Sequence, residues 1–477
     1  MTWDVVIGVE IHVQLGTERK LFCGDRVSFG EAPNTHVCPV CLGLPGALPT
    51  VNPEAVRLAL TTALALDCAV HPRSVWARKS YFYPDLPKGY QISQLEEPLA
   101  TDGRLVFDGA DGERSVRIRR IHMEEDAGKL VHDRFPDVSA VDLNRAGTPL
   151  VEIVTEPDLR SAADTRAFLG ALKQVLEYLD VSDCNMEEGS LRADANVSLR
   201  PVGTEELGTK TEIKNVNSFS GVERALELEI ERQRAVLEAG GRIEQQTLLW
   251  DDHRGTIRPM RSKEQSHDYR YFPDPDLPAL ILSEGEIDTA RAELPELPRE
   301  RRTRLVAAHA LSEYDASVLT QTVATADYFE AVAAATGDAK TAANWVMGPV
   351  QALVNERRED LAGFPIGPDR LAALLALVEE GVVSDGAAKK VLVLLAEEET
   401  APREVVEREG LVQVRDSAQL ESWVTDVLDE HPDEVERYRA GETRLLGFLM
   451  GGVMRRSGGQ ADPRQVNELL RSVLDRP

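Results

Sequence analysis

The sequence predicts an α+β protein in which a strand-rich N-terminal part precedes a helical C-terminal third. Short alternating runs, separated by Gly, Pro, Asp and Asn, fill the chain to about Ala292. Beyond the proline- and charge-rich stretch 292–305 the strand patterns nearly vanish and helical periodicity takes over. Because 477 residues suggest two or three domains, we predict domains at 1–292, 293–402 and 403–477, the last two small and all-α.

Five runs in the N-terminal part alternate, at least in part, and are predicted strands: DVVIGVEIHVQL, SVRIRRIHMEED, PLVEIVTEPD, LRADANVSL and KTEIKNVNSF. Two helices interrupt them. The first, 161–180, opens with Ser161 three residues before Asp164, as in a helix cap, and carries an apolar stripe. The second, 221–241, ends in a pair of glycines.

The net charge and the number of cysteines argue against a general nucleic-acid-binding protein and against a disulfide-stabilised secreted protein. With 54 Lys+Arg against 81 Asp+Glu the net charge is −27, so the chain should repel nucleic acid at long range. A nucleic-acid role would need local basic patches or a partner subunit. Five cysteines, three of them near the start, do not suggest a disulfide framework. Neither a signal peptide nor a membrane-spanning run is evident, so we expect a soluble cytoplasmic protein.

Polar residues gather on one face of the predicted strands. Side chains alternate between the two faces of a strand, which groups Glu10 with His12, Glu124 with His122, Asp194 with Asn196, and Glu212 with Lys214. Clustered carboxylates repel one another, and a divalent cation relieves that repulsion. Such oxygen-rich sites suit Mg²⁺ or Mn²⁺. We therefore consider a metal-assisted phosphoryl-transfer site, with a solvated sheet face as the alternative.

Common nucleotide motifs are missing from the sequence. It contains no GxxxxGK[ST] loop, no GxGxxG opening a helix, no GxSxG elbow and no kinase signature set. If the protein uses ATP, it therefore uses an uncommon pocket, and the ATP-contacting residues cannot be named.

Seven strings together resemble one family: VIGVEIHVQL, KSYFYPDLPKGYQISQ, HMEEDAGK, DLNRAGTPLVEIVTEPD, MEEGSLRADANVSLR, KTEIKNVNSF and HDYRYFPDPDLP. Over essentially its whole length the chain resembles the B subunit of the tRNA-dependent amidotransferase. The resemblance implies a mixed-sheet cradle domain at the N-terminus, followed by a helical domain and a C-terminal helical tail domain that binds tRNA. It also implies a ligase reaction, the ATP-dependent amidation of Glu-tRNA(Gln), Asp-tRNA(Asn) or both through a phosphorylated aminoacyl-tRNA.

The resemblance also implies partners. An amidase-type A subunit would release ammonia from glutamine, and a small C subunit would complete a heterotrimer. Phosphorylation is chemically reasonable, because it converts a poor leaving oxygen into phosphate, and a metal neutralises the developing charge. The alternative is a non-catalytic tRNA-binding scaffold subunit of the same complex.

Family correspondence assigns the site residues. The implied Mg²⁺ ligands are His12, Glu124 and Glu152. Candidates for a second ion or for water-mediated contacts are Glu10, Asp194 and Glu212. Lys79 and Lys214 are expected to neutralise phosphate or line the ammonia path, or else to be surface or salt-bridged lysines.

Three thiols near the start make up most of a zinc site. Some members of the family carry a zinc knuckle here, and this chain matches it at Cys23, Cys38 and Cys41. Asp25 stands in place of the remaining cysteine, and a carboxylate can bind zinc. His36 is a rival fourth ligand, and a site that has lost its metal is the alternative. A metal here would be structural.

The tail offers a local basic patch. Residues 444–477 hold six arginines and three acids, so this part is basic although the chain is acidic. Arg455 and Arg456 stand near a pair of glycines, and Lys389 and Lys390 form a second patch. We predict that these four residues contact tRNA by its shape and backbone, although any one of them could simply solvate a helix end.

Overall fold

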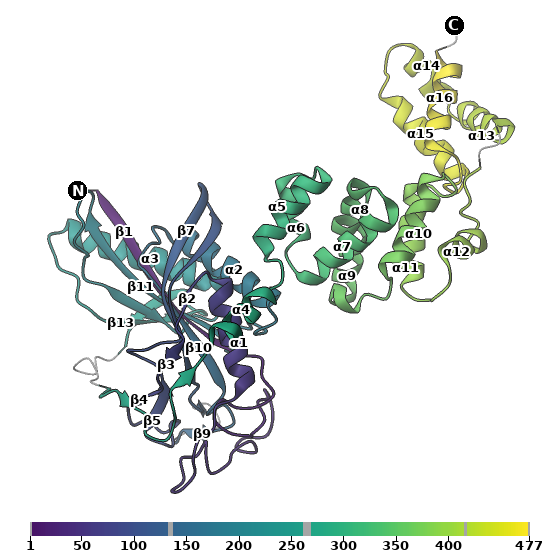
Figure 1. Ribbon diagram of the computed structural model, residues 1–477. Helices are drawn as coiled ribbons and strands as arrows, with labels where there is room; N and C mark the ends of the chain where they lie inside the picture. The colour runs from purple at the N-terminus through teal and green to yellow at the C-terminus, as the bar shows by residue number, and fades with distance from the viewer. Residues whose placement is uncertain (1, 132–136, 261–268, 415–416, 476–477) are drawn as a thin grey trace. The chain divides into compact units, whose positions relative to one another are not determined.

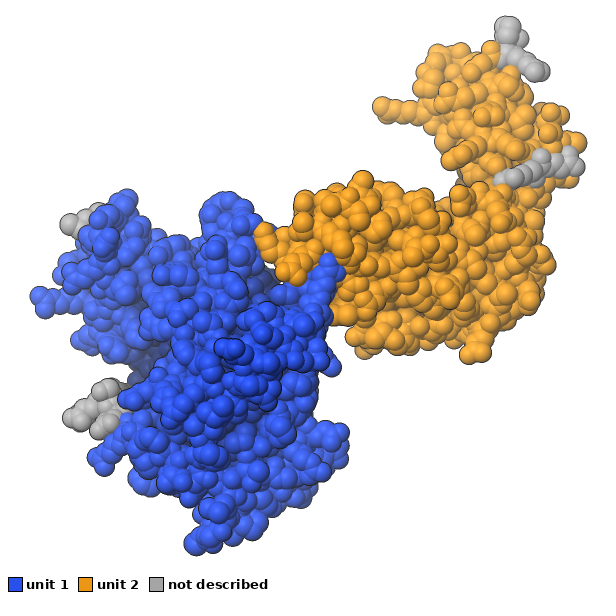
Figure 2. Space-filling model, in the orientation of Figure 1, with its two compact units in different colours: residues 1–298 blue, residues 299–477 orange. Residues whose placement is uncertain are grey.

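The structure is a computed structural model that describes residues 2–131, 137–260, 269–414 and 417–475 (Figure 1). The chain divides into two compact units, residues 1–298 and 299–477, coloured separately in Figure 2. The first unit contains the sheets and the second is helical, which confirms the predicted α+β class. The three domains predicted from the sequence stay predictions.

A nine-stranded mixed sheet forms the centre of the first unit, in the order β14-β13-β12-β11-β1-β10-β7-β6-β2. Neighbouring strands pair antiparallel except β12 and β13, which are parallel. The bounds are β1 (Trp3–Gln14), β2 (Ala69–Val70), β6 (Ala100–Gly109), β7 (Gly112–Glu125), β10 (Pro149–Thr155), β11 (Leu191–Pro201), β12 (Thr211–Lys214), β13 (Thr247–Asp251) and β14 (Thr256–Pro259).

Small sheets accompany this large one. Strand β4 (Ala77–Ser80) lies between β15 (Phe272–Pro273) and β5 (Tyr90–Ser93). Two further pairs join β3 (Arg73–Ser74) to β16 (Leu280–Ile281) and β8 (Lys129–Val131) to β9 (Ala140–Asp142).

Strand formation follows the alternation predicted from the sequence, and all five predicted runs contain a strand. The last run is shorter than predicted. Strand β12 ends at Lys214, and Asn215 adopts a left-handed φ of 65°. This conformation breaks the extended backbone and lets the chain turn into the next helix.

Four helices belong to the first unit: α1 (Pro53–Ala65), α2 (Ala162–Tyr178), α3 (Phe219–Glu238) and α4 (Glu284–Ala292). Ser161 caps α2 by accepting a hydrogen bond from the Asp164 backbone N–H, as its spacing predicts. Helix α3 begins slightly before the predicted start, because Ser218 caps it. Helices α1 and α4 were not predicted. Most positions of α1 are buried, and its exposed stripe is narrow, with Glu54 and Arg57 as its charged residues.

The core of the first unit lies on the apolar face of the sheet. Ile11 and Val13 of β1 belong to the same buried cluster as Phe168 of α2 and Leu226 of α3. Because alternate residues of β1 point the other way, His12 is directed to the opposite face. The helices therefore leave the polar face of the sheet available for chemistry.

The second unit contains two separate hydrophobic clusters, one within residues 305–406 and the other within 420–474. Pro349 lies in a short π-helical turn, Val346–Val350, between α8 and α9. None of the helices in the described ranges combines the length and apolar composition that a membrane crossing needs. The helices are α5 (Pro298–His309), α6 (Glu313–Leu319), α7 (Val323–Thr336), α8 (Ala339–Trp345), α9 (Gln351–Arg357), α10 (Pro368–Glu379), α11 (Asp385–Leu395), α12 (Pro402–Arg408), α13 (Ser417–Glu430), α14 (Pro432–Arg439), α15 (Leu445–Arg456) and α16 (Pro463–Leu474).

Candidate functional site

A row of polar residues crosses four neighbouring strands of the large sheet. His12 of β1 pairs with Arg192 of β11 on one side and with Glu152 of β10 on the other. Glu152 in turn pairs with His122 of β7. Residues that lie opposite one another in antiparallel strands project to the same face. Strand pairing therefore assembles the polar face from segments that are far apart in the sequence.

Two carboxylates and two imidazoles form the centre of this face, and we call His12, His122, Glu124 and Glu152 the carboxylate–histidine cluster. His12 Nε2 lies 3.4 Å from Glu152 Oε2 and 3.7 Å from Glu124 Oε1. His122 Nε2 lies 3.3 Å from Glu152 Oε2 and 3.7 Å from Glu124 Oε2. Each imidazole thus contacts both carboxylates.

The cluster is buried and electrostatically coupled. Glu124 and His122 are each 2% exposed. Burial lowers the pKa of His122, but the two carboxylates outweigh burial and raise this pKa to about 9. Burial raises the pKa of Glu152, but the imidazoles outweigh it and hold that pKa well below its usual range. Both acids are therefore ionised at neutral pH and present negative charge to a cation.

Three members of the cluster can hold a metal ion. His12, Glu124 and Glu152 each offer one ligand atom, and these atoms lie within 4.8 Å of one another. One nitrogen and two carboxylate donors suit Mg²⁺ or Mn²⁺ better than a thiophilic metal. These are the three residues that family correspondence named, and the structure brings them together.

His122 is a residue that the sequence analysis placed on the polar face but gave no role. Its position is fixed by alternation, because it lies on the same face of β7 as Glu124. The signal was therefore present in the sequence. Its contact with Glu152 depends on the pairing of β7 with β10, which the sequence could not supply.

Lys79 of β4 faces the same carboxylates. Burial lowers the pKa of Lys79, but Glu124 and neighbouring groups outweigh burial and raise this pKa, so the side chain stays an ammonium. Its Nζ lies 5.1 Å from the ring centre of Tyr269. The Tyr269 ring contacts Tyr81 and Tyr271 edge-on, with ring centres 6.1 and 6.2 Å apart. A cation backed by aromatic rings thus stands beside the cluster.

Lys214 neutralises the neighbouring acids of the polar face. Its Nζ lies 2.8 Å from Asp194 Oδ2 and 3.1 Å from Glu212 Oε1. Glu10 accepts a hydrogen bond from the side-chain amide of Asn196 at 3.3 Å. Burial and then Glu152 raise the pKa of Glu10. In the described residues, the groupings that can hold a metal do not include these acids, and the second-ion assignment stays a prediction.

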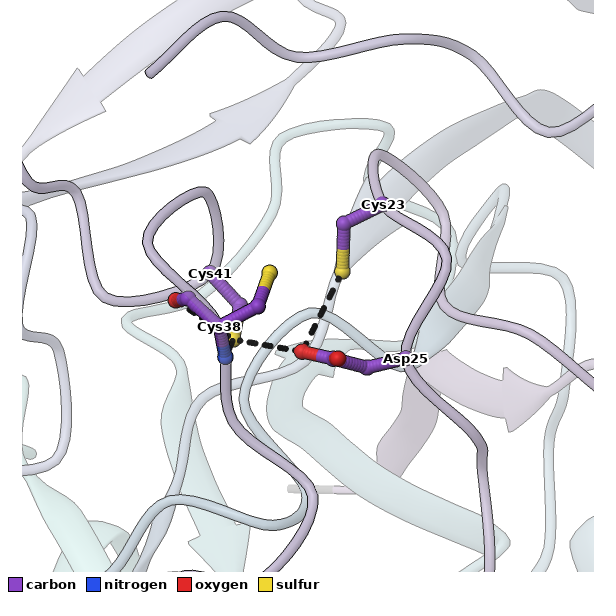
Figure 3. A group of neighbouring side chains, drawn as sticks. All are labelled: Cys23, Asp25, Cys38 and Cys41. Atoms are coloured by element: carbon purple, nitrogen blue, oxygen red, sulfur yellow. Dashed lines mark hydrogen bonds between the residues drawn. The ribbon is translucent and has the colours of Figure 1, made fainter. Parts of the chain in front are cut away.

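Cys23, Asp25, Cys38 and Cys41, which we call the cysteine cluster, form a second grouping able to hold a metal. Their ligand atoms lie within 4.8 Å of one another. Figure 3 shows the four side chains converging, with Cys23 and Cys41 Sγ lying 3.6 and 3.2 Å from Asp25 Oδ2. The rival ligand His36 is not in the grouping, and its Nδ1 lies 2.9 Å from Ser28 Oγ. The structure thus brings Asp25 to the three thiols.

The thiols of the cysteine cluster differ in acidity. A hydrogen bond with the Cys23 thiol lowers the pKa of Cys41 to about 6, and the same interaction raises the pKa of Cys23. The backbone N–H of Cys38 also donates to Cys41 Sγ at 3.1 Å. Cys41 is therefore the thiol of the cluster that is most readily deprotonated to a thiolate.

The predicted tRNA contacts lie in the helical unit. Arg456 at the end of α15 is held by Asp426 Oδ2 at 3.0 Å and Glu430 Oε1 at 2.7 Å. Lys389 of α11 lies 2.7 Å from Asp385 Oδ2, at the start of the same helix. The neighbouring Arg455 and Lys390 are exposed. Arg476, counted in the basic tail, lies outside the described residues.

Comparisons with known proteins cover nearly the whole chain. The family described as the GatB/GatE catalytic domain matches residues 5–288, and the family described as the GatB domain matches residues 327–474. A protein of Pelodictyon phaeoclathratiforme, named as the B subunit of aspartyl/glutamyl-tRNA(Asn/Gln) amidotransferase, is 52% identical over 475 residues, 100% of each chain. Its namesake from Moorella thermoacetica is 52% identical over 476 residues, covering 99% of this chain and 100% of its own.

Proposed function

Since the chain belongs to the family of aspartyl/glutamyl-tRNA(Asn/Gln) amidotransferase B subunits, we propose that it is the catalytic B subunit of such an enzyme. It converts Glu-tRNA(Gln), Asp-tRNA(Asn) or both into the amidated products used in protein biosynthesis, with ATP as the activating nucleotide. The observation that carries this proposal is the buried carboxylate–histidine cluster on the open face of the sheet.

The donor set of His12, Glu124 and Glu152 fits Mg²⁺. When bound there, Mg²⁺ would neutralise and orient the transferred phosphoryl group of ATP. The Lys79 ammonium stands beside the same carboxylates and can hold phosphate oxygens. Buried Glu124 and His122 keep water from the floor of the site, which protects a reactive acyl phosphate from hydrolysis.

Three further acids and a lysine lie near the carboxylate–histidine cluster, and we assign them supporting roles. Glu10, Asp194 and Glu212, together with Lys214, lie on the same polar face. We propose that the three acids hold a second ion or make water-mediated contacts, and that Lys214, like Lys79, neutralises phosphate or lines the path by which ammonia arrives. The contact of Lys214 with two carboxylates supports a charged lining of this kind.

The cysteine cluster fits a structural Zn²⁺. Three thiol sulfurs and one carboxylate oxygen make four donors, the number that closed tetrahedral zinc sites use. A metal there would join the two loop segments that carry Cys23 and Cys41. We therefore propose a structural rather than a catalytic role for this metal.

Partners complete the enzyme. We propose an amidase-type A subunit that supplies ammonia from glutamine, a small C subunit, and a cytoplasmic complex, since the substrate is aminoacyl-tRNA. The helical unit contacts the tRNA body through Arg455, Arg456, Lys389 and Lys390. We further propose that the cradle domain spans 1–292, the helical domain 293–402 and the tRNA-binding tail domain 403–477.

The test uses the complex reconstituted with A and C subunits. It is incubated with Glu-tRNA(Gln), Mg²⁺ and γ-labelled ATP without glutamine, and labelled phosphate is followed. We expect turnover that requires the misacylated tRNA and is lost in Glu124→Gln and Glu152→Gln. Glu223→Gln, an acid of α3 paired with Arg166, is the matched control and should behave as wild type. Full turnover by the two cluster variants would instead favour the scaffold function.

A further inference from the structure

Lys20 is completely buried beside the cysteine cluster, with 0% of its surface exposed. Its Nζ donates to the His36 carbonyl oxygen at 2.7 Å and to the Leu143 carbonyl oxygen at 3.5 Å. It also donates to Cys41 Sγ at 3.7 Å. An ammonium group has three N–H donors, so each donor has one acceptor. A buried charge is unfavourable unless it is paired and hydrogen-bonded, so Lys20 requires an anionic neighbour.

The cysteine cluster supplies that anionic neighbour, because Cys41 Sγ, which Lys20 contacts, lies 3.2 Å from the Asp25 carboxylate. A divalent cation cancels half the formal charge of three thiolates and one carboxylate, and a nearby ammonium offsets part of the rest. Lys20 lies at the sulfur that also accepts from the Cys38 backbone N–H. Groups of this kind, which contact a ligand rather than the metal, commonly tune metal affinity.

The other side of Lys20 touches the segment 143–147. At the end of this segment a Cβ on Gly147 would lie 3.3 Å from Lys20 Cδ, and its φ of 89° also favours glycine. The Gly147 N–H donates to the Asp126 carbonyl at 2.9 Å, and the Asp126 N–H donates to the Thr148 carbonyl at 2.8 Å. The segment thus connects Lys20 to the end of β7 and the start of β10.

Those two strand ends carry the carboxylates of the candidate magnesium site. Glu124 lies near the end of β7 and is paired with Leu150 of β10. Glu152 follows on β10, on the same side of the sheet. The 143–147 segment is therefore hydrogen-bonded at the end of the strand that carries Glu124 and leads directly into the strand that carries Glu152.

We propose that Lys20 is a positioning residue that couples metal binding at the cysteine cluster to cation binding at the carboxylate–histidine cluster. When the cysteine cluster holds its metal, the Lys20 ammonium is held in place and fixes the 143–147 segment. When the metal is lost, Cys41 Sγ is no longer fixed by it, so Lys20 loses a fixed acceptor and the segment is released. This coupling goes beyond the proposed function and rests on both of its metal sites.

The experiment uses the full-length chain purified with its partner subunits. Zinc retention is measured by competition with a chelator. Mn²⁺ binding at the carboxylate–histidine cluster is measured by electron paramagnetic resonance, with Mn²⁺ alone as the probe, after the chelator is removed. The samples are wild type, wild type stripped of zinc, Lys20→Met, Lys20→Arg and Glu124→Gln, the last of which defines the Mn²⁺ bound at the carboxylate–histidine cluster. Lys173→Met removes a lysine that pairs with Glu177 on the surface of α2 and serves as the control.

We expect Lys20→Met to hold zinc about 10- to 100-fold more weakly, as loss of an outer-shell partner typically causes. Its Mn²⁺ affinity should fall by the same factor as in zinc-stripped wild type. Removing zinc from Lys20→Met should not lower its Mn²⁺ affinity further, because the substitution and the loss of zinc both release the 143–147 segment. Lys20→Arg should recover part of both affinities, and Lys173→Met should match wild type.

Wild-type zinc retention in Lys20→Met would overturn the coupling, as would unchanged Mn²⁺ binding in zinc-depleted protein. Should Lys20→Met fail to fold, Asp25→Cys carries the test, because it keeps Lys20 and adds a fourth thiolate. Asp25→Cys should lose zinc only at a higher chelator concentration than wild type. Its Mn²⁺ affinity should then also fall only at that higher concentration. A fall in its Mn²⁺ affinity at the concentration that strips wild type would contradict the coupling. If wild type shows no Glu124-dependent Mn²⁺ binding, the proposed function fails together with the coupling.

Discussion

Glu152 on β10 lies directly opposite His12 on β1, and its Oε2 is 3.4 Å from His12 Nε2. The two strands are far apart in the chain and become neighbours through antiparallel pairing. Glu152 also lies 3.3 Å from His122 on its other side. A carboxylate held between two imidazoles on an otherwise open face is the feature from which the proposed chemistry follows.

Glu152→Gln should abolish most of the tRNA-dependent ATP turnover. The amide keeps the shape but loses the negative charge that a cation needs, and loss of one electrostatic contact to a transition state lowers kcat by about 100-fold or more. Single-turnover phosphorylation of Glu-tRNA(Gln) in the reconstituted complex measures the effect. The melting temperature serves as the control, since a large drop would show that the fold rather than the chemistry was lost.

Lys79→Met should lower kcat while leaving the KM for tRNA near its wild-type value. The ammonium lies beside Glu124, a proposed metal ligand, and against the Tyr269 ring, so its expected role is in phosphate transfer rather than tRNA binding. We expect a fall of about 100-fold, as for other single charge-stabilising groups. Lys79→Arg should recover part of the rate. A change confined to the tRNA KM would show that Lys79 acts in tRNA binding.

Asp126 should make the first unit sensitive to acid. Its buried carboxylate accepts from Gln14 at 2.7 Å and from Arg192 at 2.9 Å. Burial raises its pKa, but Arg192 and Arg145 outweigh burial and hold this pKa below its usual range. Because the folded-state pKa is depressed, the stabilisation is complete above the unfolded value of about 4. It is lost as the pH falls further.

Asp126→Asn tests this linkage. We expect a flatter dependence of unfolding free energy on pH below about 5, measured by urea unfolding of the metal-free chain. At neutral pH the variant should lose about 1–3 kcal/mol, because the buried carboxylate loses its charge while its arginine partners stay partly exposed to water. If the acid dependence stays as steep as in wild type, other carboxylates must carry it.

Cys41→Ser should remove the metal from the cysteine cluster. Its Sγ lies 3.2 Å from Asp25 Oδ2 and accepts from the Cys38 N–H. Zinc content measured by mass spectrometry of the purified complex should fall close to zero. Cys68→Ser is the matched control, because Cys68 is buried outside the cluster and should keep the zinc content of wild type. Equal zinc in both variants would contradict the assignment.

Arg455→Gln should weaken tRNA binding more than Arg456→Gln. Arg455 is exposed, whereas Arg456 is held by two acids and would have to release them to reach phosphate. Loss of one phosphate contact should reduce the slope of log K against log salt by about 0.7–0.9. Filter binding of tRNA at several salt concentrations measures this slope. Arg437→Gln removes an arginine of α14 that is paired with Glu442, and this control should leave the slope unchanged.

Local sequence patterns predicted many individual elements. The alternation around His12 assigned it to the face opposite Ile11, and Ser161 caps a helix as its spacing predicts. The cap at Ser218 was not predicted. The unpredicted helix α1 shows the limit of such patterns. Most of its positions are buried and only a narrow stripe is polar, so the periodic signal is weak.

The sequence by itself determined the family, the α+β class and which side chains share a face of each strand, because these depend on local periodicity and on long matching strings. The tertiary structure alone decided which faces meet. The order β11-β1-β10-β7 differs from the chain order and places His122 against Glu152. The pairing of β12 with β11 brings Lys214 to Asp194, and the packing of the loops brings Asp25 rather than His36 among the thiols. Strand order is set by how the apolar faces bury one another across long sequence separations, and a local pattern contains no record of that choice.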